Sequence, residues 1–249
     1  MVKRLAIIDW GIGGIGIYKL IKERFGAVGI LYFSDTGAVP YGKMSRLELV
    51  ARLETILLFL KSREITHLVI GCNAASTVFP YLKLKGLKAE GIINSAVRAT
   101  EKLKPERLVL IGGRRTVLSG VYRKAMAEKG IEVKQRIAQP LSAFIESGDV
   151  SSDNLRRECS RILSPVKYSS HILLACTHYP AIIPLMKDLV SPQTIFIDPA
   201  EQLLSDISKW KLPEGGKDIF LTSGDVNAMK SSALKAFGCE ISQASNISV

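Results

Sequence analysis

The sequence has few cysteines and few histidines. Its 249 residues include three histidines and four widely spaced cysteines, Cys72, Cys159, Cys176 and Cys239. No Cys-x-x-Cys pair and no Cys/His metal-ligand spacing occurs among them. This pattern argues against a disulfide framework and against a zinc site. We therefore expect four free thiols and no metal.

Long hydrophobic runs are also missing. No apolar stretch reaches the roughly 18 residues that a membrane span needs. The apolar part of the start, MVKRLAIID, is too short for a signal peptide. We expect a cytoplasmic protein that does not contact a membrane.

Acidic residues are scarcer than basic ones. The chain has 34 Lys and Arg against 23 Asp and Glu, which gives a net charge of +11. Nucleic-acid binding would need basic residues gathered on one face with interleaved aromatics. Here they are scattered along helix-like segments such as YLKLKGLK, and aromatic residues make up only 7% of the chain. We expect no nucleic-acid partner, but a positive field that attracts a small anionic substrate.

Apolar runs alternate with amphipathic stretches along the whole chain. LAIID, GILYFSD, HLVIGCN, AEGII, RLVLIGG, HILLACT and TIFID are typical of strands buried on both faces, and SRLELVARLETILLFLKSR of a helix. The alternation predicts parallel sheets with crossover helices. RLAIIDW resembles RLVLIGG at an offset of 103 residues, and THLVIGCN resembles SHILLACT at 104. Two matches at nearly one offset predict two similar α/β domains related by pseudo-twofold symmetry, with no linker between them.

Two of the thiols end matching strands. Cys72 follows HLVIG, and Cys176 follows HILLA. Ligands of open parallel sheets bind beyond the carboxyl ends of the strands, so both thiols lie where chemistry is expected. A thiol and a thiolate facing each other can remove a proton from one side of a carbon and deliver one to the other. Asp9, at the end of the first strand, and His178 could assist them.

The stretch DWGIGGIG contains Gly11, Gly13 and Gly16 in the pattern G-x-G-x-x-G, and Asp35 follows nineteen residues later. This pattern is found in dinucleotide-binding loops. The alternative is a loop at a helix start whose backbone N–H groups hold a carboxylate. The Asp-Trp pair before the glycines favours the carboxylate.

Eight collinear blocks resemble the aspartate/glutamate racemase family: IIDWGIGGIG, YFSDTGAVPYG, VIGCNAAS, RRTVLSGVY, FIESGD, LACTHYP, FIDPAE and FLTSGD. The resemblance implies two α/β domains with the active site in the cleft between them, and a chain that returns to the first domain near its end. On this basis we predict a first domain of residues 1–95 and 206–249 and a second of residues 96–205. It also implies a cofactor-independent enzyme, commonly a homodimer.

The resemblance assigns roles to individual residues. It implies that Cys72 acts on the D-isomer and Cys176 on the L-isomer, assisted by Asp9, Glu146 and His178. The substrate-binding residues that it implies are Pro40, Tyr41, Gly42, Asn73, Thr116 and Thr177. We add Trp10 and Ala74, which stand where the family usually has Ser and Thr.

The sequence thus predicts an amino-acid racemase with two catalytic thiols, with glutamate as the default substrate and D-glutamate for peptidoglycan as the product. Because Trp10 and Ala74 replace two hydroxyls, we expect weak activity on glutamate. The alternatives are a racemase of another amino acid such as aspartate, a small-diacid isomerase or decarboxylase, and a binding protein on a decayed site.

Overall fold

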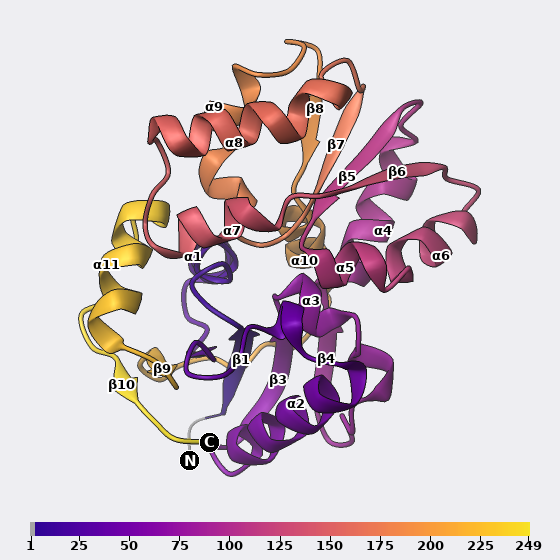
Figure 1. Ribbon diagram of the computed structural model, residues 1–249. Helices are drawn as coiled ribbons and strands as arrows, with labels where there is room; N and C mark the ends of the chain where they lie inside the picture. Colours follow the sequence, from indigo (N-terminus) through magenta and orange to yellow (C-terminus); the bar gives the residue numbers. More distant parts are fainter. Residues whose placement is uncertain (1–2) are drawn as a thin grey trace.

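The protein, described here by a computed structural model of residues 3–249, is built on two parallel sheets. The first has the spatial order β10 (Ser245–Asn246), β9 (Ile219–Thr222), β2 (Ile30–Ser34), β1 (Arg4–Asp9), β3 (Ile65–Ile70) and β4 (Lys88–Gly91). The second has the order β6 (Val133–Ile137), β5 (Leu108–Gly112), β7 (His171–Ala175) and β8 (Ile195–Ile197). Each sheet with its helices is called a domain below, and the two domains form the two lobes of Figure 1.

The two sheets repeat one arrangement. In the first sheet β2, β1, β3 and β4 lie side by side, and in the second β6, β5, β7 and β8 do so in the same order. All the pairs are parallel. The predicted class, two similar parallel-sheet α/β domains, is confirmed. Cys72 and Cys176 follow the equivalent strands β3 and β7.

Helices cover both faces of each sheet. The longer ones are α1 (Ile15–Phe25), α2 (Arg46–Lys61), α4 (Ile92–Leu103), α7 (Gln139–Glu146), α8 (Asp153–Leu163), α10 (Pro199–Ile207) and α11 (Val226–Phe237). The shorter ones are α3 (Asn73–Ser76), α5 (Arg114–Leu118), α6 (Val121–Ala127) and α9 (Ile183–Lys187), with 3-10 turns η1 (Tyr41–Lys43), η2 (Phe79–Tyr81), η3 (Ser164–Val166) and η4 (Tyr179–Ile182). Among the described residues, none of these helices is long and apolar enough to span a membrane.

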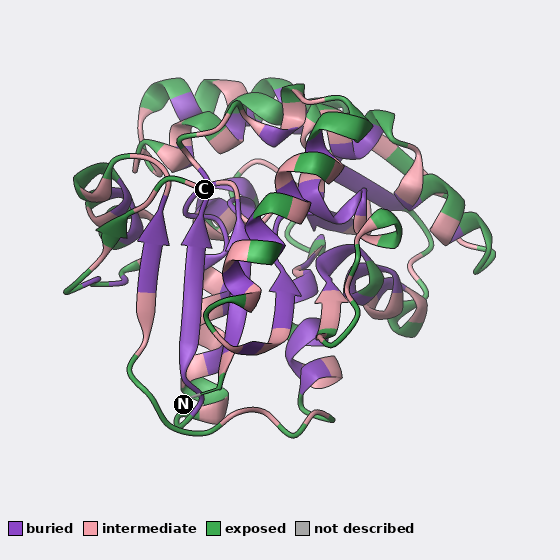
Figure 2. Ribbon diagram, turned by 90° about the horizontal axis from the view of Figure 1, so that it is seen from below, coloured by how far each residue is buried: buried purple, intermediate pink, exposed green. Residues whose placement is uncertain are grey.

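The core is divided among four apolar clusters, one on each face of each sheet. Along β1, Leu5 and Ile7 pack on the side of α1 and α10, whereas Ala6 and Ile8 pack on the side of α2. This alternation follows from the two-residue period of a strand, and burying both faces explains the continuous apolar runs. Figure 2 shows buried strands inside and exposed residues on the outer helix surfaces. Each fully buried Ile or Leu contributes roughly 1.5–3 kcal/mol.

Three strands differ from the sequence expectation. β6, β9 and β10 were not among the predicted apolar runs. β6 has the sequence VKQRI and lies at a sheet edge, where no residue of it is fully buried. A strand at the edge of a sheet does not need a continuous apolar run. The apolar-run pattern, which predicts central strands, therefore does not predict β6.

The chain crosses between the domains more than once. β9 and β10 extend the first sheet after the second has been completed. Helix α10 contributes Ala200, Leu203 and Ile207 to the core on one face of the first sheet and also contacts α4. The domain limits at residues 95 and 206 stay a prediction, and residues 1 and 2 lie outside the described part of the chain.

Candidate active site

The candidate site lies where the ends of β1, β3 and β7 face each other across the two domains. Cys72 immediately precedes α3 and is 8% exposed, whereas Cys176 follows β7 and is half-buried. Burial and then the nearby Asp9 carboxylate raise the pKa of Cys72 well above its ordinary value, and charge on Cys176 raises it further. All four cysteines are free thiols, as expected.

Asp9 ends β1 and is fully buried. Thr177 Oγ1, from the second domain, donates a hydrogen bond of 2.8 Å to Asp9 Oδ2, and the Trp10 N–H donates one of 2.7 Å to Oδ1. Burial raises the pKa of Asp9, and the opposing effects of His178, Thr177 and Trp10 do not cancel this. A buried carboxyl with a raised pKa beside a thiol is suited to proton exchange.

His178 lies between a thiol and a carboxylate. Its Nδ1 is 3.6 Å from Cys176 Sγ, and its Nε2 is 2.6 Å from Glu146 Oε2. Burial alone would lower the pKa of His178. The negative charges and hydrogen bonds of Cys176 and Glu146 outweigh burial and raise that pKa well above its ordinary value. These contacts favour the protonated form of the imidazole next to the Cys176 sulfur.

The glycine loop does hold a carboxylate, and it is that of Glu146. Glu146 Oε2 accepts a 2.9 Å hydrogen bond from the Ile12 N–H. A Cβ atom on Gly11 would lie 2.1 Å from Glu146, and one on Gly13 would lie 2.3 Å from Thr177 Oγ1. These glycines are needed because side chains of the second domain occupy the space beside them. The same side chains fill the space that a dinucleotide would need beside the glycines, so a dinucleotide-binding loop is not the better interpretation of the pattern.

Asn73 carries an unpaired donor. It is buried at the start of α3, and its Oδ1 accepts a 2.7 Å hydrogen bond from the Tyr122 hydroxyl of the second domain. Its Nδ2 has no partner within residues 3–249. A buried donor without an acceptor costs roughly 1–3 kcal/mol. An acceptor on a ligand would remove this cost.

The loop with Pro40, Tyr41 and Gly42 is held by a buried carboxylate. Asp35 Oδ2 accepts hydrogen bonds of 2.8 Å from the Tyr41 hydroxyl and from Arg52 Nε. The Tyr41 hydroxyl is therefore committed to Asp35. The sequence suggested Asp35 only as part of a dinucleotide-binding pattern and not in this role, although Asp35 lies within the block YFSDTGAVPYG.

Trp10 also holds this loop. Its indole Nε1 donates a 3.2 Å hydrogen bond to the Ala38 carbonyl, and its half-buried ring packs, as Ala74 does, against the core on the α2 side. The indole donor is thus used within the protein. Thr116 is buried on α5, which contacts η1 of the first domain.

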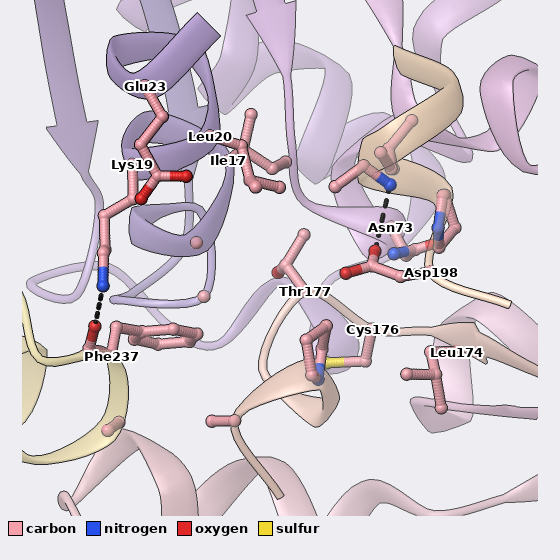
Figure 3. A pocket seen from close by; sticks show the side chains of 18 of the residues that line it. Ile17, Lys19, Leu20, Glu23, Asn73, Leu174, Cys176, Thr177, Asp198 and Phe237 are labelled. Atoms are coloured by element: carbon pink, nitrogen blue, oxygen red, sulfur yellow. Dashed lines mark hydrogen bonds between the residues drawn. The ribbon is translucent and has the colours of Figure 1, made fainter. Parts of the chain in front are cut away.

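A cavity of about 400 Å³ borders part of this group. Asn73, Cys176 and Thr177 line it together with residues of α1, α10 and α11. Figure 3 shows Cys176 and Thr177 at its centre, between Ile17 and Leu20 of α1 and Leu174 of β7. Cys72, Asp9 and Trp10 are not part of its lining.

Hydrogen bonds thus connect the domains at this junction, between Thr177 and Asp9, Glu146 and Ile12, Tyr122 and Asn73, and from Arg115 to both Thr77 and Met44. Most of the groups predicted from the sequence are brought together here. Their individual roles stay predictions. Tyr122 and Arg115 were not foreseen, although Tyr122 closes the quoted RRTVLSGVY block.

The fold and this junction define a class of protein: two parallel-sheet α/β domains whose reactive side chains meet where the domains face each other. No family model matches the chain. The chain is 31% identical over 214 residues to glutamate racemase 3 of Caldanaerobacter subterraneus. The aligned residues make up 83% of this chain and 78% of the relative. The chain belongs to the glutamate racemase family.

Solved structures of glutamate racemases share the fold. The enzyme of Bacillus anthracis superposes with a TM-score of 0.89 at 23% identity, covering 99% of this chain and 98% of its own. The enzyme of Francisella tularensis, solved in complex with D-glutamate, superposes with a TM-score of 0.87 at 23% identity. The alignment covers 99% of this chain and 97% of the Francisella chain.

Proposed function

We propose that this protein is a glutamate racemase that moves protons at the α-carbon with Cys72 and Cys176 and needs no cofactor. The observation that carries the proposal is the pair of thiols at equivalent strand ends of two equivalent sheets. Each thiol has an acid/base group beside it, Asp9 for Cys72 and His178 for Cys176. Single-base chemistry would leave this pairing unexplained.

In the proposed reaction, the Cys176 thiolate takes the α-proton of L-glutamate, and the electron pair of the broken C–H bond spreads into the α-carboxylate. The Cys72 thiol then gives its proton to the opposite face of the same carbon. The product is D-glutamate, with a thiol at Cys176 and a thiolate at Cys72. No atom or electron is gained or lost overall, and the reverse reaction exchanges the two roles.

The surroundings of the thiols fit these starting states. The raised pKa of Cys72 keeps it protonated at neutral pH, ready to donate. The His178 imidazolium, 3.6 Å from the Cys176 sulfur, stabilises negative charge there. The free Asn73 Nδ2 is a donor for a substrate carboxylate. We assign the remaining predicted residues, Pro40, Tyr41, Gly42, Thr116, Thr177, Trp10 and Ala74, to the walls of the substrate site.

Glutamate is the substrate that the family membership favours over aspartate or another diacid. We also propose that its D-glutamate serves peptidoglycan synthesis and that the active form is a homodimer. That the protein needs no metal or pyridoxal phosphate, and that it binds neither nucleic acid nor membranes, stay predictions.

The test follows the α-proton directly. The protein is incubated with L- or D-glutamate in D₂O, and loss of the α-proton NMR signal is recorded with and without EDTA. We expect exchange that EDTA does not affect. Cys72→Ser and Cys176→Ser should each slow racemisation by at least about a thousandfold, because either loss removes one of the two bases.

Cys159→Ala and Cys239→Ala are the matched controls, since both thiols are buried in cores away from the junction. They should retain full activity. Racemisation at the normal rate by Cys176→Ser would show that the two-thiol proposal is wrong. Exchange of the α-proton with aspartate but not with glutamate would show that aspartate is the substrate.

A further inference from the structure

A second cavity, of about 420 Å³, lies at another part of the domain junction. Gly42, Arg46, Thr77 and Tyr81 line it from the first domain, and residues of α5 and its surroundings line it from the second. It shares no lining residue with the cavity that borders Cys176. Because Gly42 lines it, this cavity lies beside the loop of Pro40, Tyr41 and Gly42.

Three cations face this cavity without a counter-charge. Its lining includes Arg46, Arg114 and Arg115 and no Asp or Glu. Within residues 3–249, none of the three guanidinium groups forms an ion pair with a carboxylate. Because guanidinium groups stay protonated in proteins, the pocket carries three positive charges.

Arg115 is fixed at the edge of the cavity. Its Nε donates a 3.0 Å hydrogen bond to Thr77 Oγ1, and its Nη1 donates one of 2.6 Å to the Met44 carbonyl. Its Nη2 has no hydrogen bond to any described residue. Burial and then the charge of Arg46 lower the pKa of Arg115, which shows that the two cations repel each other. A bound anion would offset this repulsion.

Arg46 is also oriented by a neighbour. Its guanidinium lies 5.1 Å from the centre of the Tyr81 ring, and its Nη1 is 3.4 Å from the Tyr81 hydroxyl. Arg114 is exposed and lines the cavity, and its guanidinium forms no ion pair with a carboxylate of the described part of the chain. The fork of a guanidinium matches the paired oxygens of a carboxylate or phosphate.

We propose that this three-arginine pocket is a binding site for a small oxyanion, a carboxylate or phosphate group, held by Arg46 from one domain and by Arg114 and Arg115 from the other. The volume suits a small molecule. Since the arginines come from both domains, a bound anion ties the domains together next to Gly42 and Thr116. The proposal goes beyond the proposed racemase function and does not depend on it.

Inorganic phosphate is the probe, and thermal unfolding is the measurement. The melting temperature is compared in phosphate and in chloride at equal ionic strength. At about twentyfold excess over Kd, a single site should raise it by roughly 3–7 °C. The variant Arg46→Gln/Arg114→Gln should lose this shift. The control Arg123→Gln/Arg157→Gln, with two exposed arginines outside the pocket, should keep it, and it also corrects for the general stabilising effect of phosphate.

A second measurement identifies the source of the anion. If phosphate raises the KM for glutamate at unchanged kcat in the wild type but not in Arg46→Gln/Arg114→Gln, the pocket receives a carboxylate of the substrate itself. If the phosphate shift occurs without a change in KM, the ligand is a separate anion. Both outcomes support the site. Equal phosphate shifts in the pocket variant and in the control variant would overturn it, whether or not the protein racemises glutamate.

Discussion

At the scale of single residues, the two thiols occupy equivalent places in unlike surroundings. Cys72 is buried next to the Asp9 carboxylate, whereas Cys176 is half-buried next to the His178 imidazolium. Negative charge opposes a thiolate and positive charge favours one. The repeat therefore supplies two thiols, and their neighbours place opposite charges beside them.

Trp10 and Ala74 stand where the resemblance to the family leads us to expect Ser and Thr. The indole N–H of Trp10 is used by Ala38, and Ala74 has no polar side-chain atom. We expect weak turnover of glutamate, because neither side chain can bind it through a hydrogen bond. Trp10→Ser combined with Ala74→Thr should raise kcat/KM by about tenfold to a hundredfold. This kcat/KM is measured by following the racemisation of L-glutamate by circular dichroism in the wild type and in the double variant.

Trp10→Phe is the control for this prediction, since it keeps an aromatic ring and adds no hydroxyl. It should give no gain. Brisk turnover of glutamate by the wild type, with no higher kcat/KM in the double variant, would mean that Trp10 only packs against the loop of Pro40, Tyr41 and Gly42.

At the scale of elements, the start of helix α10 carries a half-buried carboxyl group, that of Asp198, which lines the cavity beside Cys176. Asp198 caps this helix by accepting a 2.9 Å hydrogen bond from the Ala200 N–H. Burial raises the pKa of Asp198 from 3.8 to about 6, despite that hydrogen bond. The folded state therefore holds this proton more tightly than the unfolded state does. The free energy of unfolding falls as the pH rises from about 4 to 6, by up to roughly 3 kcal/mol from this group.

Asp198→Asn keeps a good cap and removes the charge. We expect the variant to be more stable than the wild type at pH 7, by up to roughly 3 kcal/mol, and equally stable below pH 4. Urea unfolding at pH 4, 5.5 and 7 measures the difference. Asp225→Asn is the control, because Asp225 caps α11 in the same way but is exposed. A stability difference that does not vary with pH would contradict the explanation that desolvation of the Asp198 carboxylate lowers the stability.

At the scale of the whole molecule, the site exists only while the domains are held together. Glu146 shows this most clearly, because it reaches from α7 to the Ile12 N–H of the first domain and also holds His178. Its carboxylate fixes the geometry of the junction and helps to keep the imidazolium charged.

Glu146→Gln retains an acceptor for Ile12 and removes the negative charge. The pKa of His178 should then fall, because one of the groups that raise it is neutral. We expect kcat to drop by about tenfold to a hundredfold and the alkaline limb of the pH–rate profile to move to lower pH. The change in kcat/KM must be equal in both directions, since D- and L-glutamate have equal free energies in water.

Glu158→Gln provides the comparison, as Glu158 is paired with Arg161 on α8, away from the junction. It should leave the pH profile unchanged. An unshifted alkaline limb in Glu146→Gln would show that Glu146 only positions His178.

Local patterns in the sequence are enough to predict the parallel α/β class, the internal repeat and the placement of Cys72 and Cys176 at strand ends. These follow from local patterns, because a strand buried on both faces must be apolar throughout, and polar residues can begin only where it leaves the sheet. The edge strand β6 has no such pattern and was missed.

Which side chains meet at the domain junction depends on the tertiary structure. Glu146 is 134 residues from Ile12, and Arg46 is 69 residues from Arg115, so no spacing in the sequence relates them. That the glycine loop encloses Glu146, that Trp10 binds Ala38 and that three arginines share one pocket depends on how two separately patterned domains face each other. Periodicity describes the inside of each domain, and the contacts between the two domains are irregular, so packing alone sets them.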